Sequence, residues 1–234
     1  MPKLIHCRLL LCGLLLLPML AAAAPKQIKA EYEATRNGLP FATVTETYTQ
    51  SNGRYRVESV TQGLGVYALF GKRVQVSEGE VTADGLKPQH FELRREDNPK
   101  KSLFTDFDWA ANQLRMKIKN KQTSVPLQKG AQDLVSFVYQ FMFRQPTGSE
   151  FKLPVTTGKT LQTYHYKVTE RKVPLQVPAG KFTTMHLVNA EATELEDEKE
   201  LWLGAESYFL PVRLVMHDND GGKIEQQLTS LHAE

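Results

Sequence analysis

The chain has 234 residues, with 29 lysines and arginines against 26 aspartates and glutamates, and a formal net charge of +3. The balance moves closer to neutral if Lys3 and Arg8 are removed with an N-terminal leader. A near-neutral chain gives no sign of a nucleic-acid-binding protein. Its length is enough for one sizeable domain.

The pattern of residues 1–23 predicts a secretory signal peptide. Lys3 and Arg8 give a positive start, residues 9–20 form a short apolar stretch, and small residues follow at 21–24. The apolar stretch is too short to span a bilayer, which disfavours the alternative of an uncleaved anchor. We expect cleavage near Ala23, export to the periplasm, and no transmembrane span in the mature chain.

Both cysteines, Cys7 and Cys12, lie inside this leader. The mature chain is therefore expected to contain no disulfide, thiolate nucleophile or cysteine metal site. Residues 24–234 contain no Pro- or Ser-rich linker and no fixed-period repeat. We predict that they form a single β-rich domain.

Alternating apolar and polar residues predict strands through most of the mature chain. Asn37-Gly38, Asn52-Gly53 and Asp220-Gly221-Gly222 are typical of hairpin turns. Strands are expected near residues 28–34, 41–50, 55–59, 73–77, 80–83, 90–95, 102–109, 114–118, 151–155, 160–170, 173–177, 182–193, 199–203, 211–217 and 223–231. Because no helices separate them, the sheet should be antiparallel, and so many strands should curl.

One segment, at about residues 131–145, has helical periodicity. Its apolar residues repeat at i, i+3, i+4, i+7 and i+8, which gives one apolar stripe. Asp133 is placed to cap the first turn, and Pro146 prevents continuation. The predicted fold is mainly β: a strongly curved antiparallel sheet or open β-barrel, with this amphipathic helix on the concave side or over one end.

An apolar segment between Gly63 and Gly71 interrupts the strand pattern. It is interpreted either as a lid or mouth for an apolar ligand or as a plug packed into the core. Large apolar side chains from this segment, the helix and two strands are the candidate ligand-binding residues: Tyr67, Leu69, Phe70, Trp109, Phe137, Phe141 and Trp202.

No catalytic or metal-binding motif is present, so no catalytic residue, metal or other cofactor is predicted. The histidines of the mature chain are scattered over separate strands without metal-ligand spacing. Ser136 lies in a helical pattern and not in a nucleophile elbow. The acidic run that begins at Asp218 departs from a calcium loop and fits a hairpin turn better.

Two charge ladders follow the strand period. One is basic, at Arg115, Lys117, Lys119 and Lys121, and the other is acidic, at Glu194, Glu196, Glu198 and Glu200. They are interpreted first as solvated strand faces or edge protection, and second as contacts with anionic headgroups or an envelope protein partner.

Several short motifs together resemble an uncharacterised exported bacterial family, domain of unknown function 3108. They are QDLVS at 132–136 with the aromatics after it, VPAGKF at 177–182, LWL at 201–203, LPVR at 210–213 and FDW at 107–109. The resemblance implies a periplasmic β-rich protein and brings no settled activity. The fold is also similar, by analogy alone, to the curved sheets of lipoprotein carriers that hold acyl chains.

Three functions follow in order of preference. The first is a non-enzymatic periplasmic protein that binds a lipid or other apolar or amphipathic envelope ligand in the concave sheet. The second is a structural or scaffold protein that contacts envelope partners and has a fully packed interior. The third is a hydrolase whose site is assembled from distant residues, for which His165 and His186 are the histidines to inspect.

Overall fold

The structure is a computed structural model of the chain and describes residues 24–191, 199–218 and 220–234. The predicted signal peptide lies outside the described residues, as does most of the acidic ladder. Within the described part of the chain, the strands form one 15-stranded sheet.

The first half of the sheet is a meander in which each strand pairs with the next. Its strands are β1 (Gln27–Arg36), β2 (Leu39–Ser51), β3 (Arg54–Gly63), β4 (Lys72–Thr82), β5 (Gly85–Arg95), β6 (Leu103–Asp108), β7 (Gln113–Ile118) and β8 (Lys121–Pro126). Two short 3-10 helices interrupt it, η1 (Gly65–Phe70) and η2 (Pro99–Lys101).

The second half returns to the first through the pairing of β1 with the last strand. Its strands are β9 (Gln132–Asp133), β10 (Glu150–Thr156), β11 (Leu161–Val177), β12 (Gly180–Asn189), β13 (Lys199–Gly204), β14 (Pro211–His217) and β15 (Lys223–Ala233). The helical segments are α1 (Ser136–Tyr139), η3 (Gln140–Met142) and η5 (Ala205–Ser207). The order is β8-β7-β6-β5-β4-β3-β2-β1-β15-β14-β13-β12-β11-β10-β9.

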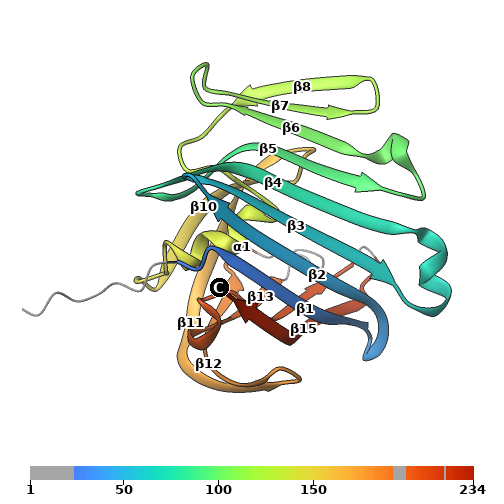
Figure 1. Cartoon of the computed structure of the whole chain (residues 1–234), viewed down its shortest axis with the longest axis vertical. Helices are drawn as coiled ribbons and strands as arrows, with labels where there is room; N and C mark the ends of the chain where they lie inside the picture. The colour runs from blue at the N-terminus through green and yellow to red at the C-terminus, as the bar shows by residue number, and fades with distance from the viewer. Residues whose placement is uncertain (1–23, 192–198, 219) are drawn as a thin grey trace, which may run out of the picture.

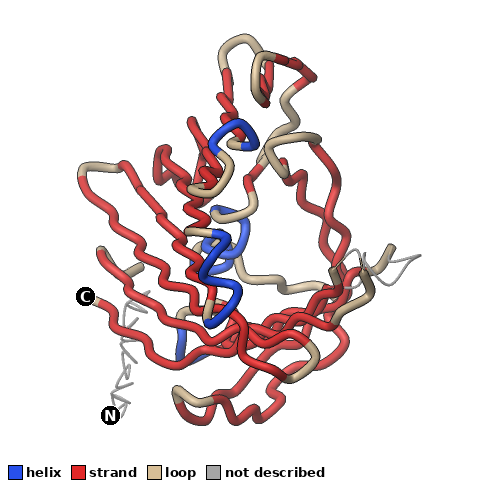
Figure 2. Tube along the Cα trace, turned by 90° about the vertical axis from the view of Figure 1, so that its right-hand side faces the viewer, coloured by secondary structure: helices blue, strands red, loops and turns tan. Residues whose placement is uncertain are grey.

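The sheet curves strongly without closing. Its edge strands are β8 and β9, and every pairing is antiparallel except that of β9 with β10. Figures 1 and 2 show the strands bending around helical segments that lie on the concave side. The prediction of a mainly β, curved antiparallel sheet with one helix is confirmed in architecture.

The predicted Asn-Gly turns set the register of the first strands. Asn37 and Gly38 have φ of 51° and 82°, and Asn52 and Gly53 have φ of 52° and 73°. Positive φ at both central residues is the conformation that two-residue hairpins favour, and asparagine and glycine tolerate it best. These turns place Tyr48 and Val57 opposite each other on the buried concave face.

The helix is shorter than predicted. It covers α1 and η3, residues 136–142, instead of about 131–145. At its start, Gln132 and Asp133 pair with β10 as strand β9. At its end, Gln140 bonds the β4–β5 turn, and its carbonyl accepts the amides of Phe143 and Arg144. Tertiary hydrogen bonds thus override the local periodicity at both ends.

The segment between Gly63 and Gly71 is not a core plug, so that alternative was wrong. It forms η1, which has no buried residue. Val66, Leu69 and Phe70 are 73%, 86% and 65% exposed. Tyr67 packs edge-on against Phe41 of β2, with ring centroids 5.6 Å apart. This segment is therefore an apolar surface patch.

Candidate functional site

The α1–η3 segment is fixed to the concave face by a buried polar network centred on Asp133. One carboxylate oxygen, Oδ1, accepts the backbone amides of Val135 (2.9 Å) and Ser136 (2.8 Å). The other, Oδ2, accepts the hydroxyl of Ser77 at 2.6 Å, and Ser77 lies 2.9 Å from the Tyr55 hydroxyl. Asp133 is fully buried, and burial raises its pKa while these hydrogen bonds oppose the rise. The expected cap is therefore present, and it also ties α1 to β4.

A second set of bonds holds the end of this segment over the β4–β5 turn. Gln140 accepts the Leu86 amide at 2.7 Å and donates to the Asp84 carbonyl at 2.9 Å. Gln132 donates to the Leu86 carbonyl at 2.8 Å, and Arg144 forms an ion pair with Asp84. Residues on both sides of α1 therefore fix the α1–η3 segment against the concave face of the sheet.

Two hollows flank the α1–η3 segment. The inner one, cavity A, has a volume of about 290 Å³ and lies between α1 and the sheet. The outer one, cavity B, has about 860 Å³ and lies beside η3 and the 145–148 loop. Small-molecule pockets in proteins span about 300–1,000 Å³, so the volume of cavity A is just below this range and that of cavity B is within it.

Cavity A has one apolar wall. Phe137 and Val138 of α1 face Tyr164 and Leu201 across it. The rings of Phe137 and Tyr164 meet edge-on, with centroids 5.6 Å apart. The apolar and aromatic residues of this wall are Leu134, Phe137, Val138, Tyr164, Tyr166, Leu201, Leu214 and Met216, and Lys199 and Gln226 line the cavity beside them.

The opposite wall is polar, and the strand register explains why. Glu46, Ser59 and Gln75 are directly opposite one another on β2, β3 and β4, and Thr61 and Arg73 form the next row. Opposed residues of an antiparallel pair share a face, so these side chains form one stripe on the concave side. All five line cavity A.

Glu46 is held within this stripe by hydrogen bonds. It accepts the Tyr139 hydroxyl at 3.1 Å and the Ser59 hydroxyl at 3.2 Å. Burial raises the pKa of the Glu46 carboxyl, and the two hydrogen bonds counter part of the rise. Tyr139 also stacks on Tyr48, with centroids 5.6 Å apart. The polar wall is therefore ordered, with its carboxylate already bonded to neighbouring side chains.

Cavity B is larger and combines aromatic side chains with a polar rim. Phe141 packs edge-on against Phe151, with centroids 5.6 Å apart. Trp109 donates its indole N–H to the Pro88 carbonyl at 2.6 Å and stacks on Phe107. The fixed indole and the two phenyl rings give cavity B a rigid apolar side.

The structure brings three of the seven predicted ligand-binding residues to these cavities. Phe137 lines cavity A, and Trp109 and Phe141 line cavity B. Tyr67, Leu69 and Phe70 line neither cavity, because η1 lies on the surface.

Trp202 is the remaining predicted residue, and it faces away from cavity A. Its neighbour Leu201 lines that cavity, and successive strand residues point to opposite faces. The Trp202 indole stacks on His186, with centroids 4.2 Å apart, and the Arg213 guanidinium lies 4.5 Å from its centre.

The sequence interpretation missed the polar stripe. Alternation in β4 suggests that Val74 and Val76 face the core, whereas Arg73 and Gln75 face the cavity. No signal within β4 shows this, and only the register of Ser77 with Val57 of β3 places the odd-numbered side of β4 on the concave face.

The two histidines of the hydrolase hypothesis lie outside both cavities. His165 is bonded to Glu191 at 2.9 Å and to Glu150 at 3.0 Å. His186 lies 2.9 Å from the Thr169 hydroxyl and 2.8 Å from a Glu200 oxygen. The order Thr169–His186–Glu200 matches that of a nucleophile, base and carboxylate. However, His186 stacks on Trp202 and lies on the face opposite cavity A.

Among the described residues, no cluster of three or more histidine, cysteine, aspartate or glutamate side chains has the geometry to hold a metal ion. No helix in the same part of the chain combines the length and apolar character that a bilayer crossing requires.

Fold and site together define a β-rich protein with an internal amphipathic cavity. A family model described as "Protein of unknown function (DUF3108)" matches residues 31–229. The chain belongs to this family, which confirms the resemblance found in its motifs. The QDLVS motif at 132–136 now has a structural role, because its residues anchor α1.

Two other comparisons add no function. No curated protein matches the chain. A crystal structure from Vibrio parahaemolyticus, provisionally described as an outer membrane lipoprotein-sorting protein domain, is 7% identical, with coverage of 89% of this chain and 85% of that one. Its TM-score is 0.29, so neither the fold nor the function of this chain follows from that similarity.

Proposed function

We propose that the protein is a non-enzymatic periplasmic carrier that binds an amphipathic envelope ligand in cavity A. The observation that carries the proposal is the amphipathic lining of this cavity, with mainly apolar and aromatic side chains around α1 and a polar stripe on β2, β3 and β4. An apolar chain would pack against Phe137, Leu201 and Leu214, where burial releases water from apolar surface. The polar end of the ligand would face Gln75 and Arg73.

The proposed location is supported by the leader pattern in residues 1–23. A non-enzymatic role is supported by the placement of His165 and His186 away from both cavities. Glu46, the carboxylate that lines cavity A, is bonded to Tyr139 and Ser59. The polar stripe fits recognition of a polar headgroup better than proton transfer.

A fluorescent probe tests this proposal. The neutral dye N-phenyl-1-naphthylamine gains fluorescence in apolar sites, and the delipidated protein should bind it and release it to a phospholipid competitor. Leu214→Trp should fill cavity A and weaken dye binding at least about tenfold. Because the added ring would enter existing space, the free energy of unfolding should change by less than the 1–3 kcal/mol that overpacking costs.

Lys117→Trp is the matched control, because it adds the same ring at an exposed position on β7. It should leave dye binding unchanged. Dye binding that survives Leu214→Trp, or a wild-type protein that never binds the dye, would contradict the proposal.

A second candidate function is a scaffold that contacts the envelope through the η1 patch. Residues 64–70 carry no charge, and Lys72 follows after Gly71. Besides Tyr67, four side chains of this segment are large, apolar and at least 37% exposed. This composition suits the surface of an anionic lipid bilayer, where apolar residues insert and lysine meets headgroups.

Vesicle flotation tests the second function. Phe70→Ser should reduce binding to phosphatidylglycerol vesicles, whereas Phe104→Ser, at an exposed aromatic on β6, should not. Equal flotation of both variants would remove the patch from consideration.

A further inference from the structure

Two arginines face each other across neighbouring strands on the concave face. Arg73 of β4 is directly opposite Arg95 of β5, one row beyond Gln75 and Leu93. Like charges directly opposite each other destabilise a sheet. Folding alone therefore gives no reason for this pair, and another group is needed to balance it.

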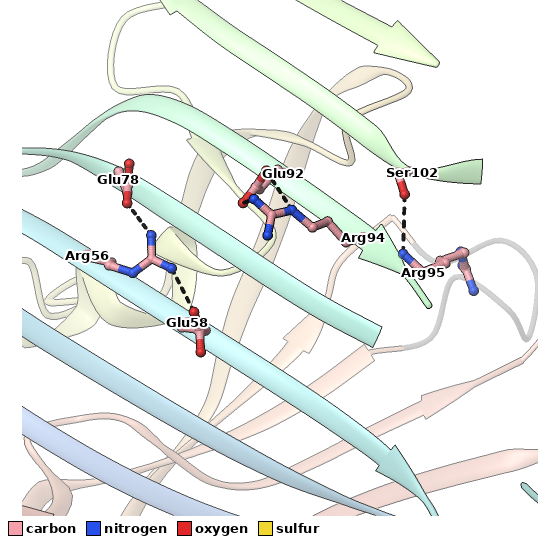
Figure 3. Close-up of polar contacts among 7 residues, drawn as sticks. All are labelled: Arg56, Glu58, Glu78, Glu92, Arg94, Arg95 and Ser102. Carbon is pink, nitrogen blue, oxygen red and sulfur yellow. Dashed lines mark hydrogen bonds and ion pairs between the residues drawn. The ribbon is translucent and has the colours of Figure 1, made fainter. Parts of the chain in front are cut away.

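The outer face of the same strands shows the usual solution. Arg56 forms ion pairs with Glu58 and Glu78, and Arg94 pairs with Glu92 (Figure 3). Arg95 differs, because its contact in Figure 3 is a bond from its backbone amide to the Ser102 hydroxyl at 3.3 Å. Its guanidinium has no ion pair within the described part of the chain.

Arg73 is the more confined of the two. Its Nε atom is buried without a hydrogen-bond partner among the described residues. Burial, and then the charge of Arg95, lower the pKa of Arg73 to about 10, so it remains protonated at neutral pH. A buried donor without a partner costs about 1–3 kcal/mol, more when it is charged. A ligand anion would supply the missing acceptor.

A third cation lies at the same place. The β10–β11 loop crosses over β5 and β6 at Gly158, where a side-chain carbon would come within 3.1 Å of Leu103. This close approach positions Lys159, which lines a groove of about 350 Å³ together with Arg73 and Arg95. The groove and cavity A share Arg73 and Leu134, so they are neighbours.

Two carboxylates lie nearby. Asp97 lines an adjoining hollow with Arg95 and Lys159, but it is exposed and forms no ion pair with them in the described structure. Glu46 lines cavity A but is bonded to Tyr139 and Ser59. The cations of the groove therefore remain available to a ligand.

We propose that Arg73, Arg95 and Lys159 form a subsite for the anionic headgroup, phosphate or carboxylate, of the amphiphile in cavity A. This inference rests on the proposed function and adds the charge class of its ligand. Guanidinium groups suit the headgroup because their planar N–H donors match two oxygens of a phosphate or carboxylate at once. The shared wall at Arg73 and Leu134 joins headgroup and chain sites.

Competition with N-phenyl-1-naphthylamine tests the subsite, with decyl phosphate and 1-decanol as ligands of equal chain length. The wild-type protein should bind decyl phosphate at least about tenfold more tightly than 1-decanol. The double variant Arg73→Gln/Arg95→Gln should lose this preference and keep its affinity for 1-decanol. Lys159→Gln, in an exposed loop, should lose part of it, which keeps the test valid if the double variant fails to fold.

Arg94→Gln is the matched control, because it removes one exposed cation from the outer face of the same strand as Arg95. Its preference should equal that of the wild type, and an equal loss would show that overall charge, not the subsite, sets the preference. Inorganic phosphate should not compete with decyl phosphate at equal concentration, since a free anion lacks the chain; equal competition would overturn the proposal.

Two further outcomes separate the inference from the proposed function. If the wild type binds decyl phosphate and 1-decanol equally, the anion subsite is wrong and the carrier function stands. If neither ligand displaces the dye, both are wrong.

Discussion

Asp133→Ala is the substitution that the fold should tolerate least in the QDLVS motif. The carboxylate is 0% exposed and accepts the amides of Val135 and Ser136 and the hydroxyl of Ser77. Alanine leaves these donors without an acceptor in a place that water does not reach. The start of α1 and its tie to β4 are lost together.

The expected cost follows from those donors. The Ser77 hydroxyl can turn to Tyr55, which lies 2.9 Å away, so two buried amides remain unsatisfied. At about 1–3 kcal/mol for each, the loss is about 2–6 kcal/mol. Removing a buried charge returns part of this, because burial raises the pKa of Asp133. We therefore expect a decrease of about 3 kcal/mol in the free energy of unfolding.

Urea unfolding at pH 7, followed by circular dichroism and tryptophan fluorescence, measures this change. Asp133→Asn keeps an acceptor for both amides and should cost about 1 kcal/mol or less. Asp106→Ala, at an exposed position on β6, should stay within about 0.5 kcal/mol of the wild type. A loss below about 1 kcal/mol for Asp133→Ala, or equal losses for alanine and asparagine, would show that the carboxylate does not anchor α1 through these two amides.

Two further predictions concern pH. Burial raises the pKa of Glu46 above its ordinary 4.5. Between pH 4.5 and the raised pKa, the folded state therefore binds more protons than the unfolded state, and stability falls as pH rises through this range. Glu46→Gln should remove this fall, and the variant should gain stability relative to the wild type between pH 4.5 and 7; a constant difference would argue against the effect. The pKa of Asp218 is lowered to about 2, mainly by a hydrogen bond from Arg36. The contribution of Asp218 to folding stability is therefore present above pH 3.8 and is lost as pH falls towards 2. Asp218→Asn should flatten that acid limb in thermal melts, and an unchanged limb would rule out this ion pair as its source.

Local sequence chemistry was enough to predict the class of fold. The Asn37-Gly38 and Asn52-Gly53 turns adopt the positive φ that hairpins require, and the strands around them follow the expected alternation. The apolar stripe of the predicted helix does face the core, since Phe137 and Phe141 are buried. These features depend on a residue and its near neighbours.

The candidate site depends on long-range register, which the pattern does not contain. In β4, Val76 is 2% exposed although it faces outward, between Glu58 and Glu92 of the neighbouring strands. The charged Arg73 faces the cavity instead. Alternation alone assigns these two residues to the wrong faces, and only the pairing with β3 and β5 corrects it.

The aromatic residues show the same limit. Trp109 and Trp202 are equally apolar in the sequence, yet Trp109 lines cavity B and Trp202 faces away from cavity A. The two-residue period of a strand shows that neighbouring side chains point to opposite faces, but it does not show which of them points inward. The ends of α1 were also set from a distance, by β10 and by the β4–β5 turn.

Native mass spectrometry of the protein purified from periplasm without detergent tests whether cavity A holds a ligand. We expect a population whose mass exceeds that of the chain by one lipid-sized ligand, and loss of that population in Leu214→Trp. A single mass equal to that of the chain alone, unchanged after incubation with envelope lipids, would contradict it.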